Sequence, residues 1–580
     1  MVVTASRTPM RIDATLADVT VIDRAQIERT AGRTLPEVLA REAGVQTWSN
    51  GGAGQFSSVS LRGLDARHVL LLIDGVRYGS ALTGTPIWDN IPLESIERIE
   101  IVRGPLSGLY GSDAVAGVVQ VFTRRGEQGQ QSSAALTVGS NGTANTSAAL
   151  RFGEGAFDGA FQLGNTTTQG FSATNARAPF GAHNADRDAF RQNSGSARLG
   201  WRFAEGWRAE ANLLGSRATN HYDDGPDADT RARLRSTVVG FLVSGAVGPD
   251  WSTTIRLSRS SDANTTLATA SPYSGLGTFG TSQQQMAWEN RWGTPVGTLL
   301  VLAEQLHQQV ETPPDTSFDV AQRTIRSLAT GLNGQADAHS WQANVRHDEN
   351  SQFGNQTTGS LGYGYAVTRA WRAAASFGSS FTAPNFSDLY YPGFSNPQLL
   401  PEEGKHREFS LRWTGTASQW RFAYFDNRLR GYISSAPTPV NIPRVRADGF
   451  SLKGSTDWSG WALSAVADHT NPRNETAGEE YGKLLPRRSR NTMKLAADTR
   501  LGAVQVGASL LAVGHSFDDV ANTQRVAGFG SLDLRADWVF ERDWTLGLRL
   551  NNLADKRYET VYGYNQPGRQ VFLALRYRAR

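Results

Sequence analysis

The chain of 580 residues contains no cysteine, which excludes structural disulfides, thiolate metal sites and cysteine nucleophiles. It also lacks any run of about 18 uninterrupted apolar residues, so no membrane-spanning helix is predicted. The nine histidines are scattered, and the motifs H-E-x-x-H and G-x-S-x-G do not occur. The sequence therefore predicts no catalytic site and no enzyme.

The sequence also has no large excess of positive over negative charge. The formal net charge is only +4, without a basic tail or stripe, whereas a nucleic-acid-binding protein carries a clustered basic footprint. No nucleic-acid partner is predicted. The start, Met1-Val2-Val3-Thr4, runs into polar sequence with no secretory signal peptide. For an exported protein this indicates a processed or truncated start, and a cytoplasmic protein is the alternative.

The first 125 residues have the pattern of a small α/β domain. Thr34 to Glu37 form a capping box with proline in the first turn, which predicts a short helix ending near Gly44. The apolar run Val69 to Ile73, closed by Asp74-Gly75, is typical of a buried strand followed by a turn. Two further strands are predicted around residues 96–101 and 118–122.

From residue 126 onward, segments of about ten residues alternate apolar and polar positions. Ala197 to Phe203 and Trp207 to Leu213 form such a pair around Ala204-Glu205-Gly206, and Val571 to Ala579 repeats the pattern. Many such hairpins without helices favour a large β-barrel, which a membrane requires to be closed. A soluble all-β protein is the alternative. Four tryptophans suit interfacial girdles: Trp201, Trp207, Trp371 and Trp544.

Several motifs of the first domain resemble one family. Ser60-Leu61-Arg62-Gly63, Leu72 to Val76, Ile99 to Pro105 and Leu109 to Ala114 follow one another with the spacing of the plug of TonB-dependent outer-membrane receptors. Near the start, Val2, Val3, Thr4 and Ala5 resemble the TonB box of that family, a short segment that pairs with its partner by strand addition.

The resemblance implies an all-β transmembrane barrel of about 22 antiparallel strands with an α/β plug domain inside its lumen. The expected domains are residues 1–10 (TonB box and N-terminal extended segment), 11–125 (plug) and 126–580 (transmembrane β-barrel). It also implies a monomer in the lipid of the bacterial outer membrane. The implied partner is TonB, with the inner-membrane complex that energises it.

Within this family the chain is most similar to the cobalamin (vitamin B12) receptors. The similarity includes the loop Asn50 to Gln55, Asp348 to Gly354, Ala383-Pro384-Asn385 and the long run Asn552 to Tyr564. One departure is that the chain ends at Arg580 instead of on an aromatic residue. The resemblance implies that cobalamin is the transported ligand.

By position, the resemblance implies nine cobalamin-binding residues on the plug and the barrel. A large amphiphilic corrinoid needs apolar contact together with hydrogen bonding, and these residue types supply both. Asp65 and Asp224 depart from the types expected there. The residues are Phe56, Ser58, Asp65, Thr83, Gly84, Tyr222, Asp224, Thr281 and Arg487.

Acidic residues cluster in two neighbouring loops. Oxygen ligands without histidine or cysteine suit a hard cation, above all Ca²⁺. The spacing does not fit an EF-hand, whose sixth and twelfth positions would be Ala189 and Gly195. The resemblance implies calcium that orders these loops, with Ser172 in place of one acidic ligand. The implied ligands are Asn184, Asp186, Asp188, Asp223 and Asp229.

Three other functions stay open at this stage. A ferric siderophore or haem receptor would share the architecture but need an aromatic and arginine-rich vestibule, or histidines placed for haem. A passive porin belongs to a different class and conflicts with a plug that fills the lumen. An outer-membrane enzyme or adhesin has no recognisable site in this sequence.

Overall fold

The computed structural model describes residues 2, 4–30, 32–226, 228, 230–268, 276–435 and 438–579. Its first domain is built on a five-stranded sheet of order β1-β6-β7-β4-β5, in which β4 and β7 run parallel and the other neighbours antiparallel. The elements are β1 (Asp18–Asp23), α1 (Arg24–Glu28), α2 (Leu35–Leu39), β2 (Val45–Ser49), β3 (Ser57–Leu61), η1 (Ala66–His68), β4 (Val69–Ile73), β5 (Val76–Arg77), η2 (Leu93–Ser95), β6 (Ile96–Arg103), α3 (Ser107–Tyr110) and β7 (Gly117–Thr123).

The predicted local signals of this domain are confirmed. The apolar run forms β4, and all five of its residues are buried. The capping box opens α2, where the Glu37 carboxylate accepts hydrogen bonds from the backbone N–H and the hydroxyl of Thr34, at 2.7 and 3.1 Å. The predicted end of the helix was wrong, because α2 stops at Leu39 and the chain turns before it reaches Gly44, whose φ is +63°.

Among the described residues, 22 strands close into one antiparallel barrel, as expected, and β33 pairs with β8 to complete it. The strands are β8 (Gly129–Gly139), β9 (Thr143–Glu154), β10 (Phe157–Thr168), β11 (Phe190–Ala204), β12 (Trp207–Tyr222), β13 (Thr230–Gly248), β14 (Trp251–Ala268), β15 (Gly277–Thr294), β16 (Gly297–Glu311), β17 (Gln322–Ala336), β18 (His339–Asn350), β19 (Gly354–Ala366), β20 (Trp371–Thr382), β21 (Glu402–Thr414), β22 (Ser418–Ser434), β23 (Val440–Trp458), β24 (Trp461–Asn474), β25 (Asn491–Leu501), β26 (Val504–Val513), β29 (Phe529–Glu541), β30 (Trp544–Asn551) and β33 (Gln570–Arg578).

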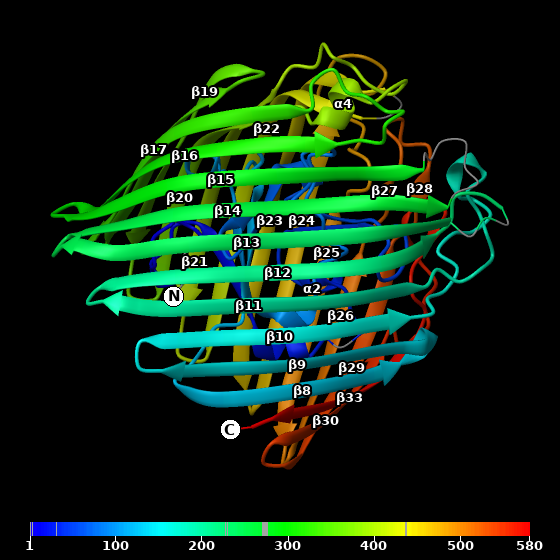
Figure 1. The fold of residues 1–580 in the computed structure, drawn as a ribbon, viewed down its shortest axis with the longest axis horizontal. Coiled ribbons are helices and arrows are strands. Elements are labelled where there is room, and N and C mark those ends of the chain that lie inside the picture. Colours follow the sequence, from blue (N-terminus) through cyan, green and yellow to red (C-terminus); the bar gives the residue numbers. More distant parts are fainter. Residues whose placement is uncertain are drawn as a thin grey trace.

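The two ends of the barrel differ. Long loops lie at the right of Figure 1, and short turns lie at the left, where the two chain ends also lie. We call these the long-loop end and the short-turn end. The long loops carry the remaining elements, which are η3 (Ser140–Gly142), η4 (Pro179–Gly181), α4 (Phe386–Tyr390), β27 (Ser516–Phe517), β28 (Arg525–Val526), β31 (Glu559–Val561) and β32 (Tyr564–Asn565).

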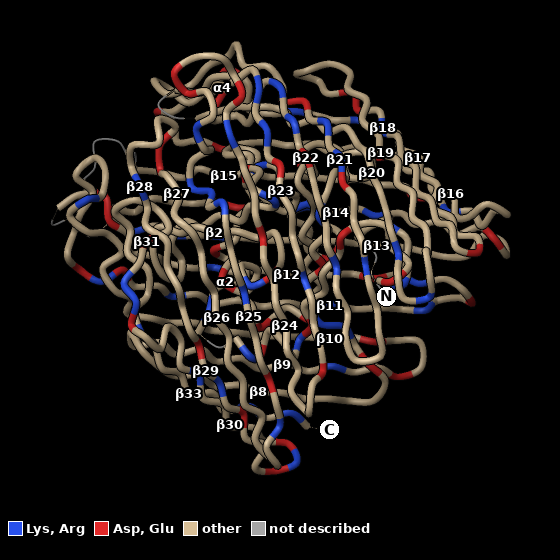
Figure 2. The backbone as a smooth tube through the Cα atoms, turned by 180° about the vertical axis from the view of Figure 1, so that it is seen from behind, with Lys and Arg blue, Asp and Glu red and all other residues tan. Residues whose placement is uncertain are grey.

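The barrel strands present apolar side chains outward and polar side chains inward. In β11, Leu199, Trp201 and Phe203 are exposed on the outer face, whereas Arg198 points inward to an ion pair with Asp74 of the plug. An outer apolar band of this kind faces lipid. Figure 2 shows acidic and basic positions spread over the strands and the interior, with no single charged patch. Among the described residues, no helix has the length and apolar character needed to span a bilayer.

The first domain sits inside the barrel as a plug and is held there by ion pairs as well as by apolar packing. Buried charges require partners, and barrel residues that face the lumen pair with four charged residues of the plug, Asp74, Arg62, Arg33 and Arg41. Arg62 pairs with Glu408 at 2.6 Å, and Arg33 and Arg41 share Asp533. Apolar residues of the plug also form one buried cluster with residues of the barrel, Leu214, Val238, Leu429, Tyr432, Val445, Ala447 and Leu485.

The last barrel strand also contacts the plug. Arg578 of β33 donates to the Glu28 carboxylate of α1 at 2.7 Å, and Arg576 donates to the Glu28 carbonyl oxygen at 2.7 Å. The seam between β33 and β8 therefore lies beside α1.

Candidate functional site

The N-terminal segment is folded into the plug instead of being extended as predicted. Val2 and Met10 form a backbone bridge, with N–H···O distances of 2.8 and 3.0 Å, and the chain turns between them. Val2, Thr4 and Ala5 are buried. Burial removes the apolar side chains of Val2 and Ala5 from water and places the Thr4 hydroxyl beside hydrogen-bond partners. Val3 lies outside the described residues.

Thr4 is the residue of this segment with the most polar contacts. Its backbone N–H and hydroxyl donate to Oε2 of Glu100 at 3.0 and 2.6 Å, and the hydroxyl lies 2.8 Å from Oε1 of the Gln120 side chain. The Tyr110 hydroxyl donates to the Thr4 carbonyl oxygen at 3.0 Å. The segment is therefore held against the plug sheet by hydrogen bonds, and release of the segment would break them.

At the long-loop end, two plug loops lie among the barrel loops and contact them, and we call this region the vestibule. The first covers residues 62–68, and the second covers residues 79–86. Thr83 is exposed in the second loop, and Gly84 beside it has φ +71°. Thr281 of β15 reaches this loop, with its hydroxyl 3.3 Å from that of Ser80. The structure thus brings Thr83, Gly84 and Thr281 together.

Phe56 and Arg487 meet through a residue that the sequence did not single out. The Trp48 ring lies 5.6 Å from the Phe56 ring and 4.4 Å from the Arg487 guanidinium. Phe56 leaves 48% of its surface exposed to the vestibule. Arg487 is fixed by Asp518, which accepts from its Nε at 2.6 Å. These three residues, Trp48, Phe56 and Arg487, form a contiguous group, which we call the aromatic shelf.

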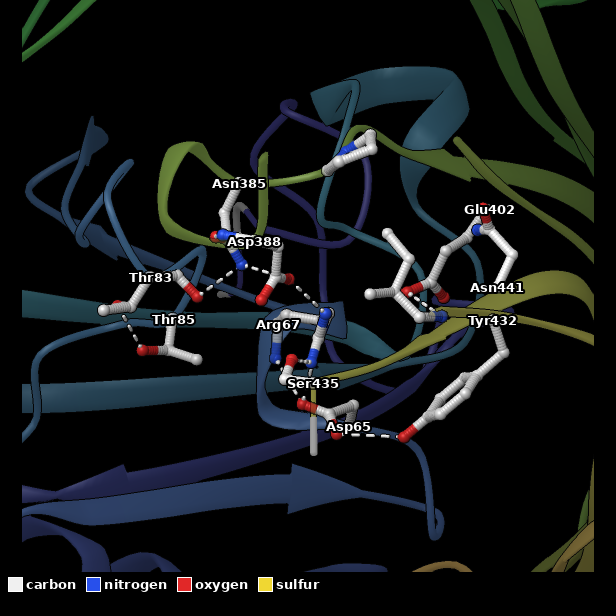
Figure 3. Close-up of polar contacts among 12 residues, drawn as sticks. Asp65, Arg67, Thr83, Thr85, Asn385, Asp388, Glu402, Tyr432, Ser435 and Asn441 are labelled. Carbon is white, nitrogen blue, oxygen red and sulfur yellow. Dashed lines mark hydrogen bonds and ion pairs between the residues drawn. The ribbon is translucent and has the colours of Figure 1, made fainter. Parts of the chain in front are cut away.

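Asp65 lies in a polar network at the base of the vestibule (Figure 3). Its Oδ2 accepts from Arg488 at 2.7 Å and from the Tyr432 hydroxyl at 3.1 Å, and its Oδ1 pairs with Arg67. Burial alone would raise the pKa of Asp65, but Arg488 and Arg67 hold it well below its ordinary value. Asp65 is therefore an anion fully matched by cations, which limits its freedom to bind a ligand directly.

The remaining predicted cargo residues are distributed differently. Ser58 is buried in β3, and its hydroxyl has no hydrogen-bond partner among the described residues. Tyr222 ends β12, and Asp224 follows it, so both lie beside the acidic cluster described next. Because Ser58 is buried, a ligand in the vestibule reaches it only after neighbouring groups move.

Three predicted calcium ligands come together in the long loops. One carboxylate oxygen each of Asp186, Asp188 and Asp223 lies within 4.8 Å of the others. Asn184 is near them, since its N–H donates to Thr174, whose hydroxyl also bonds Asp223. Asp229 lies outside the described residues.

The electrostatics of this cluster favour a cation. Burial raises the pKa of Asp188 to about 8, and the nearby carboxylates of Asp223 and Asp186 add to the shift. Burial and Asp186 likewise raise the pKa of Asp223 to about 6. Oδ1 of Asp223 is buried without a hydrogen-bond partner among the described residues. Converging carboxylate oxygens that repel one another, one of them without a hydrogen-bond donor among the described residues, fit a hard cation. Ser172 is a neutral residue and adds no charge to the cluster. Its hydroxyl donates to the carbonyl oxygens of Thr174 and Asn184.

Below the aromatic shelf, a cavity of about 190 Å³ separates α2 and β2 from the barrel wall, and Trp48, Lys494 and Tyr558 line it. Sites for drug-sized ligands occupy about 300–1,000 Å³. This cavity is therefore too small to hold a ligand of that size while the plug keeps its present position.

Sequence reasoning missed Trp48, Arg67, Tyr432, Asn385 and Asp388 as members of the site. Asn385 stood in the Ala383-Pro384-Asn385 motif, which was a signal without an assigned role. Trp48 had a weaker signal, as an aromatic residue just before the predicted plug loop. Arg67 and Tyr432 had none, since their contacts join segments far apart in the chain.

Comparison with known proteins matches both parts of the chain. Residues 134–553 match the family model "TonB dependent receptor-like, beta-barrel", and residues 11–118 match "TonB-dependent Receptor Plug Domain". The vitamin B12 transporters BtuB of Vibrio cholerae and Photobacterium profundum are both 29% identical over 591 aligned residues, which cover 100% of this chain and 95% of theirs.

Solved structures share the fold at lower sequence identity. A crystal structure of the ferric enterobactin receptor PfeA of Pseudomonas aeruginosa superposes with a TM-score of 0.84 at 17% identity and covers 100% of both chains. The siderophore receptor PirA of Acinetobacter baumannii has a TM-score of 0.84 at 15% identity, over 97% of this chain and 98% of its own.

Proposed function

Because the chain belongs to the TonB-dependent receptor family and lies in the bacterial outer membrane, we propose that it imports cobalamin across that membrane. The full-length similarity to vitamin B12 transporters supports this cargo. The aromatic shelf supports the proposal structurally, since it joins the exposed ring of Phe56 to the Trp48 ring and to the polar guanidinium of Arg487. A large amphiphilic ligand requires that combination.

We also propose that the acidic cluster binds Ca²⁺. Asn184, Asp186, Asp188 and Asp223, with Asp229, would hold the ion. Bound calcium would supply two positive charges, which offset part of the negative charge of the three clustered carboxylates. Its ligands come from the loop between β10 and β11 and from the loop after β12, so the two loops become ordered with respect to each other. Tyr222 and Asp224 are adjacent to the cluster and take their positions with it.

In the proposed mechanism, cargo binding at the extracellular, long-loop end favours release of the N-terminal segment at the periplasmic end. Such coupling is a free energy shared between two sites. TonB then captures Val2 to Ala5 by strand addition and pulls, driven by the energised inner-membrane complex. The plug rearranges and opens the path that the present cavity is too small to provide.

Titration of cyanocobalamin into the detergent-purified protein, followed by calorimetry, tests the proposal. Tight binding with Ca²⁺ that weakens after addition of a chelator is the expected result. Binding that is equally tight with chelator would remove the calcium site and leave the cargo. No binding under either condition would remove cobalamin as the cargo and leave an importer of another ligand.

A ferric siderophore is the second candidate cargo, because Arg67, Arg487 and Arg488 gather at the vestibule floor. Anionic cargo would use such cations. Each arginine is already paired, however, with Asp388, Asp518 and Asp65 respectively. The floor therefore offers little net positive charge, which favours the less charged corrinoid. Parallel titration with ferric enterobactin distinguishes the two.

A further inference from the structure

The two plug loops that face the cargo are joined to each other through the barrel. The loop of residues 62–68 carries Asp65 and Arg67, and the loop of residues 79–86 carries Thr83 and Gly84. Within the described part of the chain, no hydrogen bond runs directly between these two loops. Both are bonded instead to the barrel segment that begins α4 (Figure 3).

The start of α4 binds three consecutive carbonyl oxygens of the second plug loop. The backbone N–H of Phe386 donates to Ala81 at 3.3 Å, and that of Ser387 donates to Leu82 at 2.8 Å. The side-chain amide of Asn385 then donates to the Thr83 carbonyl oxygen at 3.0 Å. The conformation of the loop is thereby set from the barrel side.

Asn385 and Asp388 extend this attachment to the first plug loop. The Asn385 amide also donates to Oδ2 of Asp388 at 2.7 Å, and the same carboxylate oxygen accepts from Arg67 at 3.1 Å. In return, the backbone N–H of Asp388 donates to Oδ1 of Asn385 at 2.7 Å. Thr83, Asn385, Asp388 and Arg67 thus form one continuous row of hydrogen bonds.

The row is rigid on the barrel side. Asn385 and Asp388 are each only 6% exposed. The Phe386 ring is fully buried with Ala81 and Val310, and the Arg323 guanidinium lies 4.7 Å from it. Buried, mutually satisfied polar groups of this kind hold one geometry.

The glycine of the second loop fits the same account. Gly84 has φ +71°, and a Cβ there would lie 3.1 Å from Cβ of Asn385. Its lack of a side chain lets the loop approach Asn385 closely in a conformation that glycine adopts easily. The role of Gly84 is then to pack against the barrel rather than to touch cargo.

We propose that Asn385 and Asp388 are positioning residues for cargo binding. Acting as a bracket between the two plug loops, they set the distance between Arg67 and Thr83 and so shape the floor of the cargo site. The proposal rests on the proposed cargo site, but it makes a separate statement about the loops without cargo. Removal of the bracket loosens both loops, which keep their other bonds to the barrel, while the barrel and the core of the plug stay folded.

Three variants of the full-length protein test the bracket. Asn385→Ala removes both donors and the helix cap, whereas Asn385→Asp keeps the cap acceptor, removes the donors and adds a carboxylate beside Asp388. Asn396→Ala is the matched control, since Asn396 lies in the same barrel loop and, among the described residues, its side chain bonds only Pro439 and Gln398. Amide hydrogen exchange of the detergent-purified protein, measured by mass spectrometry, reports the two plug loops without cargo.

We expect faster exchange in residues 79–86 and 62–68 for both Asn385 variants and wild-type exchange there for Asn396→Ala. With cyanocobalamin as the probe, the half-saturating concentration rises about tenfold for both Asn385 variants, and the maximal uptake rate stays within about twofold. Equal loop exchange in all proteins, or equal acceleration in the control, would overturn the bracket. If cyanocobalamin binds none of the proteins, the proposed cargo fails, and the exchange comparison still decides the bracket.

Discussion

Thr4 donates two hydrogen bonds, from its backbone N–H and its hydroxyl, to the same carboxylate oxygen of Glu100, at 3.0 and 2.6 Å. Glu100 lies on β6 in the interior of the plug and is completely buried. The segment proposed to bind TonB is therefore held by a charged acceptor, and the strength of that contact sets how readily it is released.

Glu100→Gln should loosen the segment. Loss of the charge weakens both bonds by about 1 kcal/mol in total, so the released state becomes about fivefold more populated. Ser6→Cys provides a unique thiol in this cysteine-free chain, and its maleimide labelling rate reports release because Ser6 is buried. Glu97→Gln on the same strand is the control and should label at the parent rate. Equal rates in all three would show that Glu100 does not retain the segment.

Removal of the acidic cluster should abolish the effect of calcium on cargo binding. Asp188→Asn and Asp223→Asn each delete one of three converging carboxylates, and the remaining charge holds Ca²⁺ much less tightly. In calorimetric titrations with cyanocobalamin, these variants should bind equally with Ca²⁺ and with chelator. Asp315→Asn, in another long loop, should keep the difference. A calcium effect that survives both cluster variants would place the ion elsewhere.

Calcium affinity should rise with pH. Since burial and neighbouring carboxylates raise the pKa of Asp188 to about 8 and that of Asp223 to about 6, both bind protons that the ion must displace. Affinity should increase by up to about tenfold per pH unit between about pH 6 and pH 8, where one proton is displaced, more steeply below about pH 6, where two are displaced, and level off above about pH 8. Without the ion, the same shifts stabilise the loops at low pH and lose that contribution as pH rises through the folded-state values. Calcium titrations at several pH values measure the slope, and a flat profile would contradict the assignment.

The aromatic shelf should contribute directly to cargo affinity. Trp48→Ala removes the ring between Phe56 and Arg487, and we expect about a tenfold rise in the half-saturating cyanocobalamin concentration. Trp48→Phe keeps a smaller ring and should lose less. Trp458→Phe, an exposed tryptophan of the barrel, serves as the control. Unchanged affinity in Trp48→Ala would remove the shelf from the binding site.

Attachment of the plug should depend on Asp533. Asp533→Asn leaves Arg33 and Arg41 partly buried without their shared counter-ion, which costs about 3–5 kcal/mol. Ion conductance across planar bilayers should then show openings that the parent protein lacks. Asp13→Asn removes only an exposed pair with Arg11 and should conduct like the parent. A silent Asp533→Asn variant would show that the apolar packing alone retains the plug.

Local patterns predicted the elements well, because their causes lie within a few residues. The run Val69 to Ile73 became β4, and the alternation in Ala197 to Phe203 became the lipid-facing strand β11. The fold of residues 2–10 was not predictable in this way. Its conformation depends on Glu100, which lies 96 residues from Thr4.

The candidate site was predicted in fragments for the same reason. Asp186 and Asp188 were visible as a spacing, whereas Arg487 and Phe56 came only from the family resemblance. The residue that joins the latter pair, Trp48, was invisible because its two contacts come from different parts of the molecule. Likewise, Asn385 meets Thr83 across 302 residues of sequence, and no periodicity reports such a contact.

The contacts of Glu28 with Arg576 and Arg578 join the beginning of the chain to its last strand, up to 550 residues later. In synthesis, α1 emerges long before β33, yet the barrel is sealed beside it. The two arginines of β33 have this partner only when the plug lies inside the lumen. A barrel that closes around an empty lumen therefore loses these contacts at its own seam.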